Sequence, residues 1–159
     1  MQNRLETLRN EIDVLIETHQ CANSRYFISH LFGTSYFCAL LALRRGLNPE
    51  LAATCGMLHD IYQVVPGILT KHGEEGAKQA KSILKKLKLY SDDEIGIITH
   101  AISKHSKKRK IHGPYDELLK DADVLSHCLY NLDFPIVDKE VERYNKLLAE
   151  LGCSPNNNS

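Results

Sequence analysis

Apolar residues recur at steps of three and four along most of this chain, and this spacing restricts the fold more than any other feature. One such set shares a helical face near the N-terminus: Leu5, Leu8, Ile12, Leu15 and Ile16. It predicts a helix over about residues 3–18, because the period matches 3.6 residues per turn. Similar stripes, together with capping residues, predict helices over about residues 24–45, 49–60, 73–87, 91–105, 114–130 and 138–151. Strand-like alternation is almost absent, so we expect an all-α fold of about six or seven helices.

Residues that start or stop helices lie at the borders of these segments. Gly46 follows the second segment, and Asn48 with Pro49 is typical of an N-cap and a first helical turn. Ser91 and Glu94 have the spacing of a capping box, in which each side chain accepts from the other residue's backbone N–H. These local signals support the helical assignment.

Length and composition indicate one domain. The chain has 159 residues, of which 43% are apolar and 25% are charged, which is ordinary for a single globular domain. No internal repeat or linker interrupts the helical segments. We therefore expect a single domain over residues 1–152 and a disordered tail at 153–159. The apolar faces of the first and last helices permit a homodimer without requiring one.

Charge and targeting signals point away from nucleic acid and membranes. Twenty basic and twenty acidic residues cancel, so nothing global attracts the chain to polyanions. No secretory signal pattern is present, and no apolar segment approaches the roughly 20 residues that cross a bilayer. Five scattered cysteines without a Cys-x-x-Cys pair indicate neither a disulfide framework nor a zinc–thiolate site. We expect a cytoplasmic protein with a small-molecule partner.

Histidine and aspartate residues in three separate segments carry the chemistry. His59 and Asp60 follow an apolar run, His30 lies one long helix upstream, and Asp123 lies downstream. If the fold unites them, they supply imidazole and carboxylate ligands to a divalent metal ion. Buried ionised groups are costly without partners, so packing alone is a poor explanation for the set. The pattern predicts a metal-dependent hydrolase site.

The helix predicted over 91–105 offers one more ligand. At about 100° per residue, His105 falls within the apolar arc that contains Ile98 and Ile102. His100 points nearly the opposite way. We therefore predict an internal His105 and a solvated His100.

These motifs resemble the HD-domain superfamily of metal-dependent phosphohydrolases. The resemblance rests on His30, on Ala-Thr-Cys-Gly-Met-Leu-His-Asp-Ile ending at Ile61, and on Lys-Asp-Ala-Asp-Val-Leu ending at Leu125. It covers roughly residues 26–130. It implies an orthogonal helical bundle, and it implies that the quartet His30, His59, Asp60 and Asp123 binds metal, with Asp60 bridging if two ions bind.

Two further stretches are similar to the binuclear branch of that superfamily, which includes YqeK-like enzymes that split diadenosine tetraphosphate. The resemblance implies that His72, before Gly76-Ala77, and His105, in Ala-Ile-Ser-Lys-His, supply additional ligands. One-metal deoxynucleotidases usually carry a carboxylate three positions after the His-Asp pair. Here that position is Gln63, which counts against that assignment.

The last ligand segment contains two aspartates, Asp121 and Asp123. Two helical positions are about 200° apart, so both cannot face one ion. Periodicity does not choose between them, because both flank the same apolar stripe. The resemblance selects Asp123, and Asp121 is then expected to support a ligand or to lie on the helix surface.

The expected reaction is hydrolysis of a phosphoester or phosphoanhydride in a small, nucleotide-type substrate by metal-activated water. Mixed imidazole and carboxylate ligation does not define the metal. The resemblance favours one or two iron or manganese ions, with cobalt, nickel, magnesium or zinc as alternatives. Two other classes remain open: an HD-type di-iron oxygenase and a non-catalytic metal-bound sensor.

A basic run over residues 104–110 surrounds His105. We expect Lys104 to assist catalysis, and Lys107, Lys108 and Arg109 to bind substrate phosphates. The alternative for this run is a solvated loop. Other polar residues nearby are expected to serve packing or to lie on the surface: His112, Tyr115 and His127.

Overall fold

The computed structural model describes residues 3–19, 24–64 and 72–154, apart from the side chains of Val64 and His72. In this part of the chain all regular secondary structure is helical, which confirms the all-α prediction. The helices are α1 (Arg4–Thr18), α2 (Ser24–Arg45), α3 (Pro49–Leu58), α4 (Ile61–Val64), α5 (His72–Leu87), α6 (Asp92–Lys104), α7 (Pro114–Tyr130) and α8 (Asp138–Leu151). The seven longer helices match the seven predicted segments, and only the four-residue α4 is additional.

The helices begin and end at the capping residues that the sequence predicts. The Asn48 side chain accepts from the backbone N–H groups of Glu50 and Leu51, and Pro49 opens α3. At α6, Ser91 and Glu94 form both hydrogen bonds of a capping box. Gly46 ends α2 with a positive φ of 68°, a backbone conformation that glycine adopts without strain.

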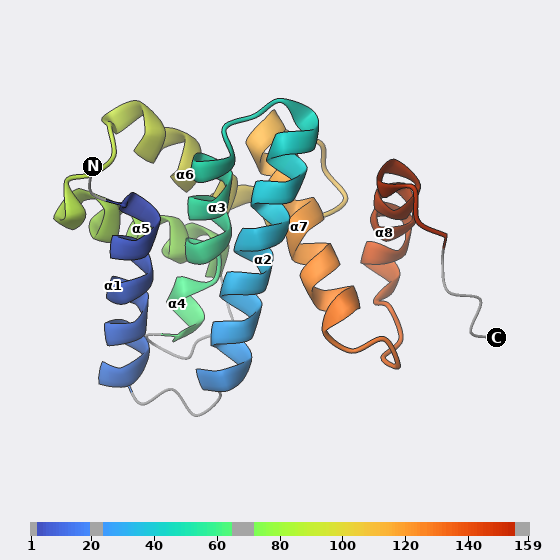
Figure 1. Cartoon of the computed structure of the whole chain (residues 1–159), viewed down its shortest axis with the longest axis horizontal. Coiled ribbons are helices and arrows are strands. Elements are labelled where there is room, and N and C mark those ends of the chain that lie inside the picture. Colours follow the sequence, from blue (N-terminus) through green and yellow to red (C-terminus); the bar gives the residue numbers. More distant parts are fainter. Residues whose placement is uncertain (1–2, 20–23, 65–71, 155–159) are drawn as a thin grey trace.

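Helix α3 forms the centre of the bundle. Every residue from Leu51 to Leu58 is buried, which explains why this segment reads as an almost continuous apolar run. In Figure 1, α2 runs beside α3 and α7, and α8 lies at the far end of the molecule beyond α7. Helices α5 and α6 pack on each other, and the inner face of α1, with Leu8, Ile12 and Ile16, is buried in the common core. This packing fixes the ends of α3, α6 and α7 relative to α2.

The expectation of no membrane-length segment was wrong for α2. This helix has 22 residues and is apolar enough to cross a bilayer, by length and composition alone. The core helix of a globular bundle passes the same test. Here α2 packs along α3 and α7 and buries the polar side chains of His30, Thr34 and Ser35 among them.

One glycine allows α2 and α3 to approach closely. A Cβ atom on Gly56 would lie 2.6 Å from Ser35 Cα, 2.7 Å from Ser35 N and 2.9 Å from the Thr34 carbonyl carbon. Those atoms are backbone and cannot turn aside as a side chain does. Gly56 therefore sets the separation of the two helices that carry His30 and His59.

Candidate metal centre

Four polar side chains from three parts of the chain converge in the interior. His30 comes from α2, His59 and Asp60 from the turn between α3 and α4, and Asp123 from α7, and all four are buried. His30 Nε2 lies 3.0 Å from His59 Nε2, 3.6 Å from Asp60 Oδ2 and 3.4 Å from Asp123 Oδ1. His59 Nε2 lies 3.6 and 3.5 Å from the same two oxygens. The fold thus brings the expected quartet together.

Hydrogen bonds to the outer nitrogens orient the imidazoles. His59 Nδ1 donates to the Gly56 carbonyl oxygen at 2.7 Å, and His105 Nδ1 donates to the Ile102 carbonyl oxygen at 2.6 Å. A carbonyl only accepts, so the proton of each neutral ring sits on Nδ1 and the Nε2 lone pair points inward. His30 Nδ1 pairs with Ser126 Oγ at 3.1 Å. Metal-binding histidines are typically held in this way.

The spacing of the inward atoms suits a shared cation. Two donor atoms that each lie about 2.1 Å from one ion are about 3 Å apart when their bonds meet at a right angle. Two groups of described residues place one ligand atom each within 4.8 Å of the others: His30, His59 and Asp60 form one group, and His30, Asp123 and His127 form the other. Asp123 Oδ1 is buried and accepts no hydrogen bond from the described residues. The residues present therefore fit a divalent metal ion.

Electrostatics keep both acids ionised. Burial raises the pKa of Asp60, but the neighbouring histidines, His59 first among them, outweigh burial and hold that pKa well below its usual range. At Asp123 the Lys108 charge and the histidines likewise outweigh burial and lower the pKa. Burial lowers the pKa of His30, yet its contacts with the two carboxylates raise it to about 9. The cluster thus favours positive charge where its inner atoms meet.

His105 extends the cluster beyond the quartet. It caps the C-terminal end of α6, is 2% exposed, and places Nε2 3.3 Å from Asp60 Oδ1. Burial lowers its pKa, so the ring favours the neutral form that binds metal. His100 differs: its side chain is 58% exposed and its Nδ1 lies 2.8 Å from Asp116 Oδ1. The predicted ligand His72 has a side chain outside the described part of the chain.

Lys108 lies inside the protein and not on a solvated loop. It is 7% exposed, and its Nζ donates to Asp123 Oδ2 and, at 3.0 Å, to the His105 carbonyl oxygen. Lys107 and Arg109 are exposed, and Lys104 is half-buried. The basic run therefore places one ammonium group against a ligand carboxylate and leaves its neighbours closer to solvent.

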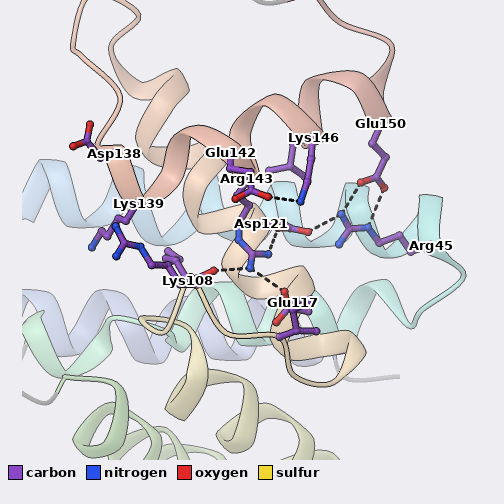
Figure 2. A pocket seen from close by; sticks show the side chains of 13 residues that line it. Arg45, Lys108, Glu117, Asp121, Asp138, Lys139, Glu142, Arg143, Lys146 and Glu150 are labelled. Atoms are coloured by element: carbon purple, nitrogen blue, oxygen red, sulfur yellow. Dashed lines mark hydrogen bonds and ion pairs between the residues drawn. The ribbon is translucent and has the colours of Figure 1, made fainter.

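Asp121 faces away from the cluster, and it is not on the surface. Figure 2 shows its carboxylate between two arginines, with Oδ2 2.7 Å from Arg45 Nη2 and Oδ1 2.6 Å from Arg143 Nη1. Arg143 also donates to Glu117 and to the Lys108 carbonyl oxygen. Asp121 therefore belongs to an ion-pair network that ties α7 to α2 and α8.

His127 belongs to the cluster, although its sequence context predicts a packing or surface role. Its ring stacks on His30 with centroids 4.9 Å apart, and its Nε2 lies 3.4 Å from Asp123 Oδ1. Nδ1 lies 3.4 Å from the buried carboxylate of Glu140, on α8. The signal was available in the sequence, because residues four positions apart share a helical face.

Comparison with known proteins identifies the family. The family model described as the HD domain matches residues 27–127. A ribonuclease Y from Chlorobium luteolum is 29% identical over 99 residues, which is 62% of this chain and 17% of that protein. The chain thus spans about a sixth of the length of this relative, and no solved structure matches it significantly. HD domains bind divalent metal ions and are generally hydrolases. With its quartet assembled in a helical bundle, this chain belongs to the HD-domain family.

Proposed function

We propose that the protein is a metal-dependent phosphohydrolase that cleaves a phosphoester or phosphoanhydride bond in a small, nucleotide-type substrate. The observation that carries the proposal is the convergence of inward-facing Nε2 atoms and ionised carboxylates at distances that suit one ion. Membership of the HD-domain family supports the class of reaction.

In this proposal His30, His59, Asp60 and Asp123 would hold the first ion. His105 and His72 would complete a second ion with Asp60, as the resemblance implies; the side chain of His72 lies outside the described part of the chain. The contact between His105 Nε2 and Asp60 Oδ1 supports this binuclear arrangement, which resembles the YqeK-like branch. Imidazole and carboxylate donors together favour iron or manganese, with cobalt, nickel, magnesium and zinc as alternatives to be tested.

When bound here, a divalent ion would lower the pKa of a bound water and withdraw charge from a phosphoryl oxygen. The protein's own groups prepare the site for that chemistry. Gly56, Ile102 and Ser126 fix the histidine rings through their Nδ1 atoms. Lys108 holds its ammonium group against the Asp123 carboxylate, and we propose that this charge helps to stabilise the reacting phosphoryl group. The exposed Lys107 and Arg109 are proposed to attract the substrate's phosphates, and Lys104 to assist the reaction.

The relative's name raises RNA as a second substrate class. The equal numbers of basic and acidic residues in this chain argue against strong nucleic-acid binding, which needs many phosphate contacts from lysine and arginine. We therefore propose a small substrate and treat RNA cleavage as an outcome to be tested.

The test is a hydrolysis screen with the purified protein loaded separately with each of the six metals. Substrates are bis(p-nitrophenyl) phosphate, nucleoside mono- and polyphosphates, diadenosine tetraphosphate and a short RNA. We expect release of phosphate or nucleotide with manganese or iron, and loss of turnover in Asp60→Asn. The matched control is Asp13→Asn, an exposed residue of α1.

No hydrolysis of any substrate by protein with metal bound would contradict the proposal, as would equal turnover in Asp60→Asn. Oxygen consumption by the ferrous protein, without hydrolysis, would favour the oxygenase alternative. Circular dichroism of each variant separates loss of the site from loss of the fold.

A further inference from the structure

A hollow beside the candidate metal centre is lined mainly by aromatic and apolar side chains, unlike the metal centre itself. It has a volume of about 360 Å³ and lies between the first turns of α2, the last turns of α7 and residues 131–137. We call it the aromatic hollow, and its principal lining residues are Tyr26, His30, His127, Tyr130, Phe134 and Val137. His30 belongs to both the quartet and this lining, so the hollow opens directly beside the proposed metal ligands.

Three aromatic rings stand partly exposed around the hollow. Tyr26 is 39% exposed, Tyr130 is 56% exposed and Phe134 is 66% exposed. Tyr26 stacks parallel to the His30 ring, with an interplanar angle of 4°, and meets Tyr130 edge-to-face with centroids 5.4 Å apart. Exposed aromatic surface gathered in a concave site beside reactive groups is typical of ligand binding and not of a solvated face.

The charge of the hollow limits what it can hold. Among the described residues that line it there is no lysine or arginine, and its one acid, Glu140, is buried against His127. A second hollow, between α7 and α8, differs in that lysines and arginines, among them Arg45, Lys108 and Arg143, line it together with acidic residues (Figure 2). Apart from His30, whose pKa is raised to about 9, a phosphate chain would find no positively charged side chain in the lining of the aromatic hollow, whereas a neutral planar ring would find stacking partners.

Resting on the proposed function, we propose that the aromatic hollow binds a neutral planar ring, such as a nucleobase, that is attached to the phosphoryl group being hydrolysed. The ring stacks against Phe134 and Tyr130 while its phosphate reaches the quartet past His30. The substrate is then a compact ring-bearing phosphoester, and the protein discriminates against phosphoesters that lack a ring.

The first test measures binding without catalysis. Adenosine and ribose are titrated into the metal-free protein by NMR. We expect adenosine to bind, ribose not to bind, and adenosine affinity to fall at least about fivefold in Phe134→Ala, the fold-change given by about 1 kcal/mol of stacking. Phe134→Tyr keeps a ring and is expected to retain affinity. Leu43→Ala, at an apolar residue 69% exposed on α2, is the matched control.

The second test compares substrates. The ratio of kcat/KM for adenosine 5′-monophosphate to that for ribose 5-phosphate is expected to fall at least about fivefold in Phe134→Ala and to stay unchanged in Leu43→Ala. Absence of adenosine binding to the wild type, or equal affinity in Phe134→Ala, would overturn the inference even if phosphoesters are hydrolysed. Binding that depends on the ring, without hydrolysis of any phosphoester, would support the aromatic hollow as a ring-binding site and would contradict the proposed function.

Discussion

Asp121 and Asp123 lie two residues apart on α7, and both are buried carboxylates, yet they have opposite surroundings. Asp121 makes short ion pairs with Arg45 and Arg143, so its charge is neutralised by cations of the protein. Asp123 faces three imidazole rings and one lysine, and its Oδ1 accepts no hydrogen bond from the described residues. Burial of charge alone does not mark a functional site. The difference lies in whether the protein's own hydrogen bonds satisfy the buried oxygens.

The largest expected effect is that of Asp123→Asn. Replacement of groups that only orient ligands typically costs about 10–100-fold in metal affinity. Loss of a ligand charge should therefore exceed about 100-fold in manganese affinity and should abolish turnover, while helicity is retained. Titration calorimetry and circular dichroism check both expectations. Unchanged manganese affinity would remove Asp123 from the metal centre.

His105→Ala is expected to have the next largest effect. It should reduce occupancy of the second ion only, because the quartet that holds the first ion stays intact. Elemental analysis gives the number of ions per chain. The matched control is His100→Ala, on the same helix but exposed and paired with Asp116. Equal stoichiometry in the two variants would make His105 a packing residue.

Asp121→Asn should separate stability from metal binding. Breaking a buried ion pair costs about 3–5 kcal/mol, and we expect about 2–3 kcal/mol here because Arg45 and Arg143 keep part of their exposure. Urea unfolding measures the loss in the free energy of unfolding. Manganese affinity of the folded protein should stay close to that of the wild type. A loss of affinity as large as that in Asp123→Asn would erase the contrast between the two aspartates.

The smallest expected effect on stability is that of Gly56→Ala. A methyl group at this position would overlap backbone atoms of Ser35 and Thr34. We expect a loss of about 1–3 kcal/mol in the free energy of unfolding from overpacking, together with weaker manganese binding as His30 and His59 move apart. Gly96→Ala on α6, where nothing lies within 4 Å of the added atom, serves as the control and should be neutral or stabilising. Equal results in both variants would mean that the close approach does not govern the site.

The sequence predicts the helices well because their signals are local. Asn48 and Ser91 cap their helices through neighbouring backbone groups, and the three- and four-residue apolar spacing reports each inner face directly. The short α4 has no such signal, since four residues give too little periodicity.

Tertiary contacts limit what the sequence reveals about the site. Periodicity does not separate Asp121 from Asp123, and the difference appears only when Arg45 from α2 and Arg143 from α8 meet Asp121. Lys108 likewise reads as one lysine in an exposed basic run, until the packing of α6 and α7 buries it against Asp123. The place of His127 in the cluster could have been predicted from the sequence, because the fourth residue after Asp123 lies on the same face of a helix.

The buried histidines and aspartates are expected to bind divalent metal, and the number of bound ions per chain checks this expectation. The protein is stripped with a chelator, titrated with manganese, and analysed for ions per chain, alongside Asp60→Asn and His19→Ala, an exposed histidine at the end of α1. We predict at least one tightly bound ion in the wild type and in His19→Ala, and none in Asp60→Asn. Failure of the wild type to bind an ion, or equal binding in all three proteins, would mean that these side chains do not form a metal centre.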